Sequence, residues 1–226
     1  YISALMLIAA SLPHGLNIHL EGKITSVPYI NMTLSLLKEV GIVGTFEGQI
    51  ICIDPLVELP EKKRLTVESD WSSASYYYSI AALAPGSEIQ ISSYKKESLQ
   101  GDVALAAIYE QLGVKSTFDR AQLTLHSSKD FSLPKQLTLD LSNSPDIAQT
   151  IAVNSDSLTL ASQKKELTAG VAIATYHDHR MAMAFAPLSL KVPLIIEDAG
   201  VVSKSYPGFW KDLETLGFES GSIIIA

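Results

Sequence analysis

Residues 176–184 gather the side chains of the chain that are best suited to chemistry. The segment reads Tyr-His-Asp-His-Arg-Met-Ala-Met-Ala, so two histidines, an aspartate and an arginine precede a small, apolar run that is typical of a helix. Backbone N–H groups at a helix start lack internal partners, and the helix dipole favours negative charge there. Arg180 adds a planar set of donors that suits a carboxylate or a phosphate. The segment therefore predicts an anion site at a helix N-terminus, and the alternative is a surface cap in which Asp178 pairs with Arg180.

The composition is that of a packed globular protein, with 47% apolar and 18% charged residues among 226. The net charge of −7 argues against nucleic acid or an acidic membrane as a partner, so an anionic ligand needs a local basic cluster. Cys52 is the only cysteine, which excludes an internal disulfide and fits a reducing cytoplasm. Its apolar surroundings favour a buried hydrophobic residue over a nucleophile.

Residues 1–11 are apolar on all sides, which predicts a buried helix. They carry no initiator methionine and no basic leader, and the run is too short to cross a membrane. We therefore expect no membrane segment here, and we expect the chain to be a fragment of a longer protein.

The order of predicted elements repeats along the chain. The first copy has helices at residues 1–11 and 30–40 and strands at residues 17–20 and 45–54. The second copy has helices at residues 71–83 and 98–112 and strands at residues 87–92 and 122–126. Gly41 and Gly113 close the second helix of each copy and lie 72 positions apart, so the unit is about seventy residues long.

A third copy begins with a strand at residues 137–140 and a helix at residues 147–153, and then the order fails. A fourth copy has a helix at residues 181–190, a strand at residues 192–197 and a helix at residues 208–216. Alternating helices and strands predict a layered α/β fold, and no glycine-rich phosphate loop is present. If the copies are alike, their helix starts face one way and form a single electropositive rim.

Six short motifs, in order along nearly the whole chain, resemble the enolpyruvyl transferase family, and within it the members that act on shikimate 3-phosphate. They occupy residues 26–30, 67–76, 98–102, 144–148, 176–183 and 203–207. The resemblance implies an α/β fold of repeated helix–strand units, arranged as two domains of the inside-out α/β barrel type. Residues 1–66 would end the upper domain, and residues 67–226 would form most of the lower one. The family's Lys-Glu-Thr-Asp-Arg motif is missing, so we expect a gap near residues 153 and 154.

The resemblance implies a transferase of the shikimate pathway, in chorismate and aromatic amino acid biosynthesis. It would move the enolpyruvyl group of phosphoenolpyruvate onto a hydroxyl of shikimate 3-phosphate and release phosphate, with no metal and no organic cofactor. Its partners would be these two small molecules, and we expect a cytoplasmic monomer. The alternatives are the transferase that uses UDP-N-acetylglucosamine and a relative that binds anions without catalysis. Because a motif is missing, residues 1–226 alone are expected to be inactive.

The resemblance assigns two catalytic residues. Asp146 would bind the attacking hydroxyl and take its proton, with a helix N-cap after Pro145 as the alternative role. Lys204 would contact phosphoenolpyruvate and help to move protons, with a solvated surface lysine as the alternative.

The resemblance also assigns binding residues. Arg180 would grip phosphoenolpyruvate, with His179 beside it, while Ser26 and Tyr29 would hold shikimate 3-phosphate. His177 is interpreted as a surface residue.

Other polar and aromatic groups have supporting interpretations. Glu68 and Asp70 are expected to act as hinge or supporting groups where the chain passes between domains. Trp71 and the tyrosines at positions 76–78 are expected to pack in the core.

Overall fold

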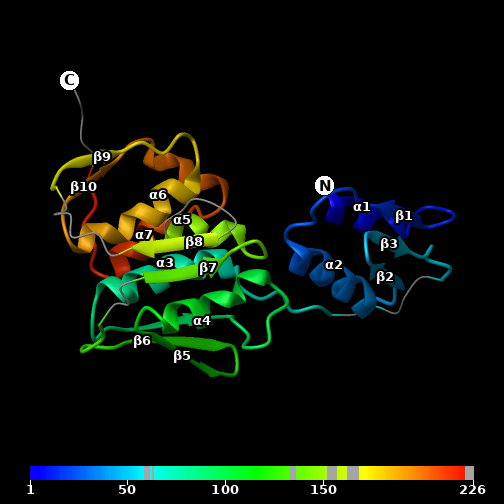
Figure 1. Cartoon of the computed structure of the whole chain (residues 1–226), viewed down its shortest axis with the longest axis horizontal. Coiled ribbons are helices and arrows are strands. Elements are labelled where there is room, and N and C mark those ends of the chain that lie inside the picture. Colours follow the sequence, from blue (N-terminus) through cyan, green and yellow to red (C-terminus); the bar gives the residue numbers. More distant parts are fainter. Residues whose placement is uncertain (59–61, 63, 133–135, 152–156, 162–167, 222–226) are drawn as a thin grey trace.

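The structure is a computed structural model that describes all residues except 59–61, 63, 133–135, 152–156, 162–167 and 222–226. Its buried apolar side chains form two clusters, one between Met6 and Ile53 and the other between Trp71 and Leu213. Figure 1 shows the corresponding N-terminal body (residues 1–58) and C-terminal body (residues 67–221) side by side. The clusters lie on either side of the domain boundary that the sequence suggests.

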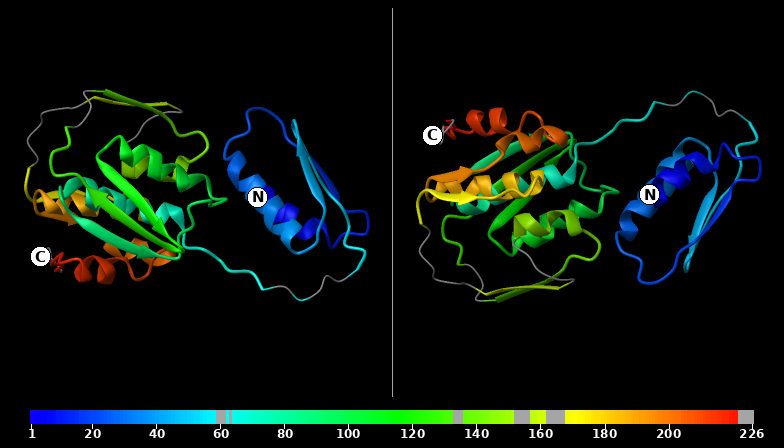
Figure 2. Two further views of the ribbon diagram at one scale, coloured as in Figure 1. Left: turned by 90° about the horizontal axis from the view of Figure 1, so that it is seen from below. Right: turned by 90° about the horizontal axis from the view of Figure 1, so that it is seen from above.

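The N-terminal body is a small sheet with two helices on one face (Figure 2). Its elements are α1 (Ile2–Ala9), β1 (Leu16–His19), α2 (Val27–Glu39), β2 (Gly44–Glu47) and β3 (Ile50–Ile53). The strands are antiparallel in the order β1-β3-β2. The prediction of one long strand at residues 45–54 is wrong, because Gly48 adopts a φ of 60° and reverses the chain between β2 and β3.

The C-terminal body opens with a second copy of this arrangement. Its elements are α3 (Trp71–Leu83), β4 (Glu88–Ser92), η1 (Gly101–Ala104), α4 (Leu105–Glu110), β5 (Val114–Asp119) and β6 (Gln122–Ser127). The antiparallel sheet has the order β4-β6-β5, so in both copies the first strand pairs with the last. The predicted repeat is therefore confirmed for these two copies, with one strand more per copy than the sequence indicates.

The remaining elements form two strand pairs and the helices between them. They are β7 (Gln136–Asp140), η2 (Pro145–Ile147), α5 (Ala148–Ile151), β8 (Ser157–Ala161), β9 (Val171–Ile173), α6 (His179–Phe185), η3 (Ala186–Leu190), β10 (Leu194–Ile196), η4 (Ala199–Lys204) and α7 (Phe209–Thr215). β7 and β8 are antiparallel, whereas β9 and β10 are parallel and α6 lies between them in the chain. The gap expected near residues 153 and 154 falls outside the described residues.

Helix α3 is the centre of the C-terminal core, since it contacts α4, α5, α6 and the β4-β6-β5 sheet. Trp71 and Tyr78 are completely buried, and Tyr76 packs edge-on against Phe209 with ring centroids 5.6 Å apart. The predicted packing role of these aromatic residues is confirmed. This helix fixes the elements that carry the candidate site.

Helix α1 is only half buried, so the prediction of a helix covered on all sides is wrong. Met6 and Ala9 are completely buried and α1 packs on α2, but Leu7 and Ile8 remain 60% and 55% exposed. Within the N-terminal body, α2 and the sheet cover only one side of α1. No helix in the described part of the chain is long and apolar enough to span a bilayer.

Candidate active site

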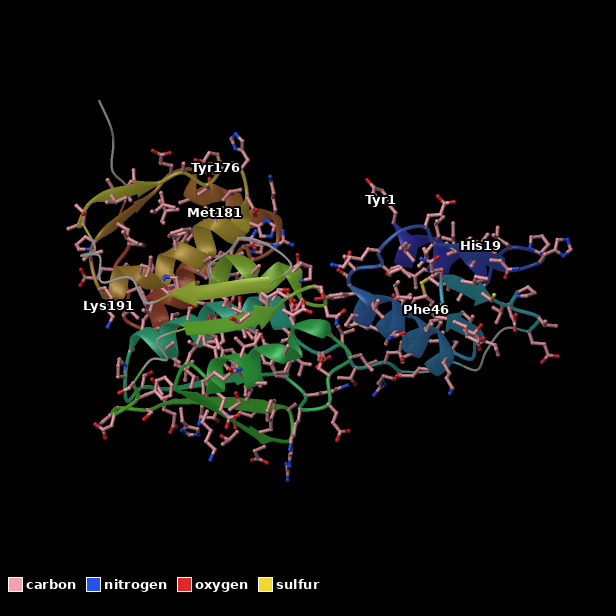
Figure 3. All side chains as sticks on the ribbon, viewed as in Figure 1. Tyr1, His19, Phe46, Tyr176, Met181 and Lys191 are labelled. Carbon is pink, nitrogen blue, oxygen red and sulfur yellow. The ribbon has the colours of Figure 1, made fainter. Side chains whose placement is uncertain are left out.

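The start of α6 is capped by the side chain of Asp178. Asp178 is the N-cap residue, and its Oδ1 accepts a hydrogen bond from the Arg180 backbone N–H at 2.8 Å. Tyr176 and His177, just before it, adopt φ angles of 53° and 59°, a left-handed region that non-glycine residues rarely occupy. Figure 3 labels Tyr176 and Met181, which bracket this turn. Asp178 therefore has the capping role that the sequence offered as an alternative.

The Arg180 side chain turns to a different carboxylate. Its Nη2 lies 2.9 Å from Oδ1 of Asp146, which comes from η2. The side chains of Arg180 and Asp146 are 33% and 42% exposed, so the pair is open to solvent. The alternative N-cap role for Asp146 is wrong, because Ser144 is the N-cap residue of η2 and Asp146 stands within its first turn. A cation and a carboxylate from distant motifs thus meet at one accessible place.

Tyr29 approaches the same place from the N-terminal body. Burial raises the pKa of its phenol well above the usual value, and the charges of Asp102 and Asp146 raise it further. Ser26, the N-cap residue of α2, donates its backbone N–H to the Ser142 carbonyl at 3.2 Å. Its φ of 56° is again left-handed. The start of α2 therefore reaches the C-terminal body close to Asp146.

Lys204 lies at the end of η4, which packs against α6. Its Nζ donates to the carbonyl of His177 at 3.3 Å, and the side chain is exposed. The lysine is thereby tied to the turn that precedes Arg180. No contact between Lys204 and Asp146 is found among the described residues.

Two histidines flank Asp178 and have different surroundings. His179 is partly buried, and its Nδ1 lies 3.9 Å from Asp178 Oδ1. His177 has a side chain that is 86% exposed, as the sequence predicts, yet its Nδ1 lies 3.0 Å from Asp198 Oδ2. This second pair joins the turn before α6 to the start of η4, a link that the motif does not indicate.

Glu68 and Asp70 organise the start of α3. Asp70 is its N-cap residue and accepts hydrogen bonds from the Ser72 backbone N–H and from Ser73 Oγ, each at 3.0 Å. Glu68 Oε1 accepts from Ser98 Oγ at 2.6 Å. The supporting role expected for both carboxylates agrees with these contacts.

Asp102 is the polar residue that sequence reasoning missed. It is completely buried, and its Oδ2 accepts from Ser72 Oγ at 2.5 Å. Burial raises the pKa of Asp102, and the hydrogen bond from Ser72 partly opposes that shift. The Gln-Gly-Asp sequence at positions 100–102 was the available signal, but only the fold shows that its carboxyl is enclosed.

The chemistry available here is that of charged and hydroxyl groups. Arg180 and Lys204 can bind anions, Asp146 can accept a proton, the Ser26 hydroxyl can donate to a ligand, and the Tyr29 ring can pack against one. No group of three or more histidine, cysteine or acidic side chains in the described part of the chain could hold a metal ion.

Comparison with known sequences identifies relatives along almost the whole chain. The family model for EPSP synthase (3-phosphoshikimate 1-carboxyvinyltransferase) matches residues 1–163 and 146–213. A 3-phosphoshikimate 1-carboxyvinyltransferase from Bacteroides fragilis is 36% identical over 264 residues, which cover 96% of this chain and 63% of the relative. One from Dehalococcoides mccartyi is 31% identical, with 96% and 60% covered. The chain therefore spans about three-fifths of the length of these relatives.

The alignment also contains positions that this chain lacks. Of the 226 residues, 96% is about 217, so about 47 of the 264 positions aligned with the Bacteroides fragilis protein have no residue of this chain opposite them. The two segments matched by the family model overlap at residues 146–163, the region of α5 and β8.

Solved structures show the same fold. EPSP synthase from Acinetobacter baumannii superposes with a TM-score of 0.69 at 17% identity, over 95% of this chain and 59% of that one. The enolpyruvyl transferase NikO from Streptomyces tendae has a TM-score of 0.65 at 14% identity, over 93% and 57%. The predicted α/β fold of the enolpyruvyl transferase type is confirmed.

Proposed function

Because the chain belongs to the EPSP synthase family, we propose that it carries part of the active site of a 3-phosphoshikimate 1-carboxyvinyltransferase. The enzyme transfers the enolpyruvyl group of phosphoenolpyruvate to a hydroxyl of shikimate 3-phosphate, in the shikimate pathway. The observation that carries the proposal is the ion pair between Asp146 and Arg180. It brings a proton acceptor and an anion-binding group together at a solvent-accessible place. The two substrates are the proposed binding partners. The protein is further proposed to be a monomer and to act in the cytoplasm.

The reaction is an addition of the substrate hydroxyl to phosphoenolpyruvate, followed by an elimination of phosphate. The substrate hydroxyl oxygen bonds to C2 of phosphoenolpyruvate, while its own proton leaves and C3 gains a proton. The tetrahedral intermediate then loses a proton from C3 and expels inorganic phosphate as the C2–O bond to phosphate breaks. Such a sequence needs a base, an acid and cations for a carboxylate and two phosphates.

Asp146 is proposed to take the proton of the hydroxyl. The guanidinium of Arg180, at 2.9 Å, fixes the position of this carboxylate beside the anion-binding group. Because both side chains are partly exposed, a ligand can reach them without unfolding any element.

Arg180, His179 and Lys204 are proposed to bind phosphoenolpyruvate. The Arg180 guanidinium can form two parallel hydrogen bonds with a carboxylate or phosphate, and its side chain is 33% exposed. Within the residues that the structure describes, the Lys204 Nζ has only the His177 carbonyl as its partner, so its charge is available to an anion.

Ser26 and Tyr29 are proposed to hold shikimate 3-phosphate from the N-terminal body. Their support is the position of the α2 start, which contacts Ser142 and places Tyr29 within the electrostatic reach of Asp146. The Ser26 side chain makes no cap hydrogen bond to α2, so its hydroxyl is available to a ligand.

The domain division at residues 66 and 67 and a missing stretch near residues 153 and 154 belong to the same proposal. The separate cores and the unmatched aligned positions support them. Since about 47 aligned positions have no counterpart, we expect residues 1–226 alone to bind anionic ligands without turnover.

The test uses the three arginines of the chain, Arg64, Arg120 and Arg180. With 15N-labelled arginine, each Nε gives a separate NMR signal, so two arginines are internal controls. Phosphoenolpyruvate should shift only the Arg180 signal, and inorganic sulfate at the same concentration should shift it less. Equal shifts at all three arginines, or no shift at Arg180, would contradict the proposal.

A further inference from the structure

The Gln-Gly-Asp turn meets the start of α2 at the boundary between the two bodies. A Cβ atom on Gly101 would lie 2.5 Å from the Asn143 carbonyl oxygen and 3.1 Å from Cβ of Pro28. The glycine therefore allows an approach that a side chain would prevent. The same approach places Asp102 beside the residue that follows Pro28, which is Tyr29.

The turn is held rigidly on its own body. Gln100 accepts the Trp71 backbone N–H at 2.9 Å and donates to the Ser69 carbonyl at 2.9 Å. Ser72 binds Asp102 Oδ2 from the first turn of α3. Because α3 is the centre of the C-terminal core, Asp102 has a fixed position relative to the rest of that body.

The other oxygen of Asp102 has unused capacity. Oδ1 is buried and accepts no hydrogen bond of ordinary geometry from any described residue. A buried acceptor without a donor costs free energy, so a nearby donor gains by approaching it. The Tyr29 hydroxyl is such a donor, since the Asp102 carboxylate raises the Tyr29 pKa through its charge and through hydrogen bonding, after the larger effect of burial.

We propose that Asp102 is a positioning residue that holds the hydroxyl of Tyr29 at the boundary between the two bodies, with Asp102 Oδ1 as the acceptor. The contact fixes where the start of α2 stands relative to Asp146 on the opposite body. The link from Asp102 to substrate rests on the proposed role of Tyr29 at shikimate 3-phosphate, whereas the contact itself does not.

The charged surroundings favour this direction of bonding. Asp70 and Asp146 both raise the pKa of Asp102 and of Tyr29, and both are carboxylates that repel added negative charge. A neutral phenol that donates to Asp102 adds no charge to this acidic group. The Tyr29 hydrogen bond in turn lowers the Asp102 pKa, against the effect of burial.

The experiment follows the Asp102 carboxyl by 13C NMR in the 226-residue chain, without substrate, between about pH 3 and pH 8. Asp102→Asn identifies the signal. Tyr29→Phe removes one hydroxyl and keeps the ring, so it should raise the Asp102 pKa, because the hydrogen bond from Tyr29 lowers it. Tyr94→Phe is the matched control, because the Tyr94 hydroxyl donates to the Asp70 carbonyl instead, and it should leave the Asp102 pKa unchanged.

A second measurement covers the case in which Tyr29→Phe fails to fold. In the unmodified chain, the Cζ signal of Tyr29 should change with the same midpoint as the Asp102 carboxyl. The proposal would be overturned if Tyr29→Phe left the Asp102 pKa unchanged. It would also be overturned if the Tyr29 Cζ signal did not change as Asp102 titrates. Shikimate 3-phosphate is added last. If it leaves the Tyr29 signal unmoved while the titrations are linked, the proposed function fails and the contact stands.

Discussion

Nη2 of Arg180 lies 2.9 Å from Oδ1 of Asp146, although the two residues are 34 positions apart and come from different motifs. The pair joins α6 to η2, and α5, which directly follows η2, contacts α6. Since both side chains are partly exposed, the pair stabilises the fold by less than about 1 kcal/mol. Its main consequence is a cation and a base held together where a ligand can enter.

Arg180→Lys should weaken phosphoenolpyruvate binding about tenfold or more, because an ammonium cannot make the two parallel hydrogen bonds of a guanidinium. The free energy of unfolding should change by less than about 1 kcal/mol. Calorimetric titration and urea unfolding measure the two effects. Arg64→Lys, at an exposed position, is the control and should change neither.

Lys204→Met should lower phosphate release by about 100-fold or more in the complete product of the gene, because proton transfer loses a participating group. The fold should be unaffected, since the Lys204 Nζ contacts only the His177 carbonyl within the described structure. Lys211→Met, at an exposed position on α7, should retain full activity. Near-normal release by Lys204→Met would remove this residue from the proposed mechanism.

Stability should fall steeply in alkaline solution. Burial raises the pKa of Tyr78 to about 12, and it also raises the pKa values of Tyr76, Tyr94 and Tyr109. An unfolded phenol titrates near about pH 10, so above that pH the unfolded chain binds fewer protons than the native one. The free energy of unfolding should then decrease as pH rises from about 10 towards 12, by about 1.4 kcal/mol per pH unit for each such tyrosine.

Urea unfolding at several pH values tests this expectation. Tyr78→Phe should make the decrease less steep, since one titrating group is removed. A free energy of unfolding that stays constant between about pH 9 and pH 11 would show that folding does not raise the pKa values of these tyrosines.

Gly101→Ala should destabilise the protein by about 1–3 kcal/mol, because the added Cβ would meet the Asn143 carbonyl oxygen at 2.5 Å. Gly200→Ala is a matched control, since nothing lies within 4 Å of a Cβ there. The midpoint of urea unfolding should move for the first variant and stay within error for the second. Equal midpoints would mean that the turn adjusts without cost.

The repeat was predictable because its signals are local. Gly41 and Gly113 adopt φ angles of 88° and 85° at the helix ends, as closing glycines require. The order of the strands in the two three-stranded sheets, with the last strand in the middle, depends on tertiary pairing that no local pattern records. For the same reason the strands β5 and β9 were missed.

The candidate site was predictable as a list of residues but not as an arrangement. Motifs indicate Asp146 and Arg180 separately, whereas their pairing results from the packing of α5 on α6. Asp102 gave almost no signal, because an aspartate in a polar turn is usually exposed. Asp102 is buried through tertiary contacts with residues far away in the sequence, such as Ser72 on α3.

Phosphate release by the complete product of the gene is the most direct test of the proposed activity. The enzyme is supplied with phosphoenolpyruvate and either shikimate 3-phosphate or UDP-N-acetylglucosamine. We expect release only with shikimate 3-phosphate, and we expect Asp146→Asn to abolish it. Release only with the nucleotide sugar would keep the fold and refute the substrate, and no release with either acceptor would contradict the proposed activity.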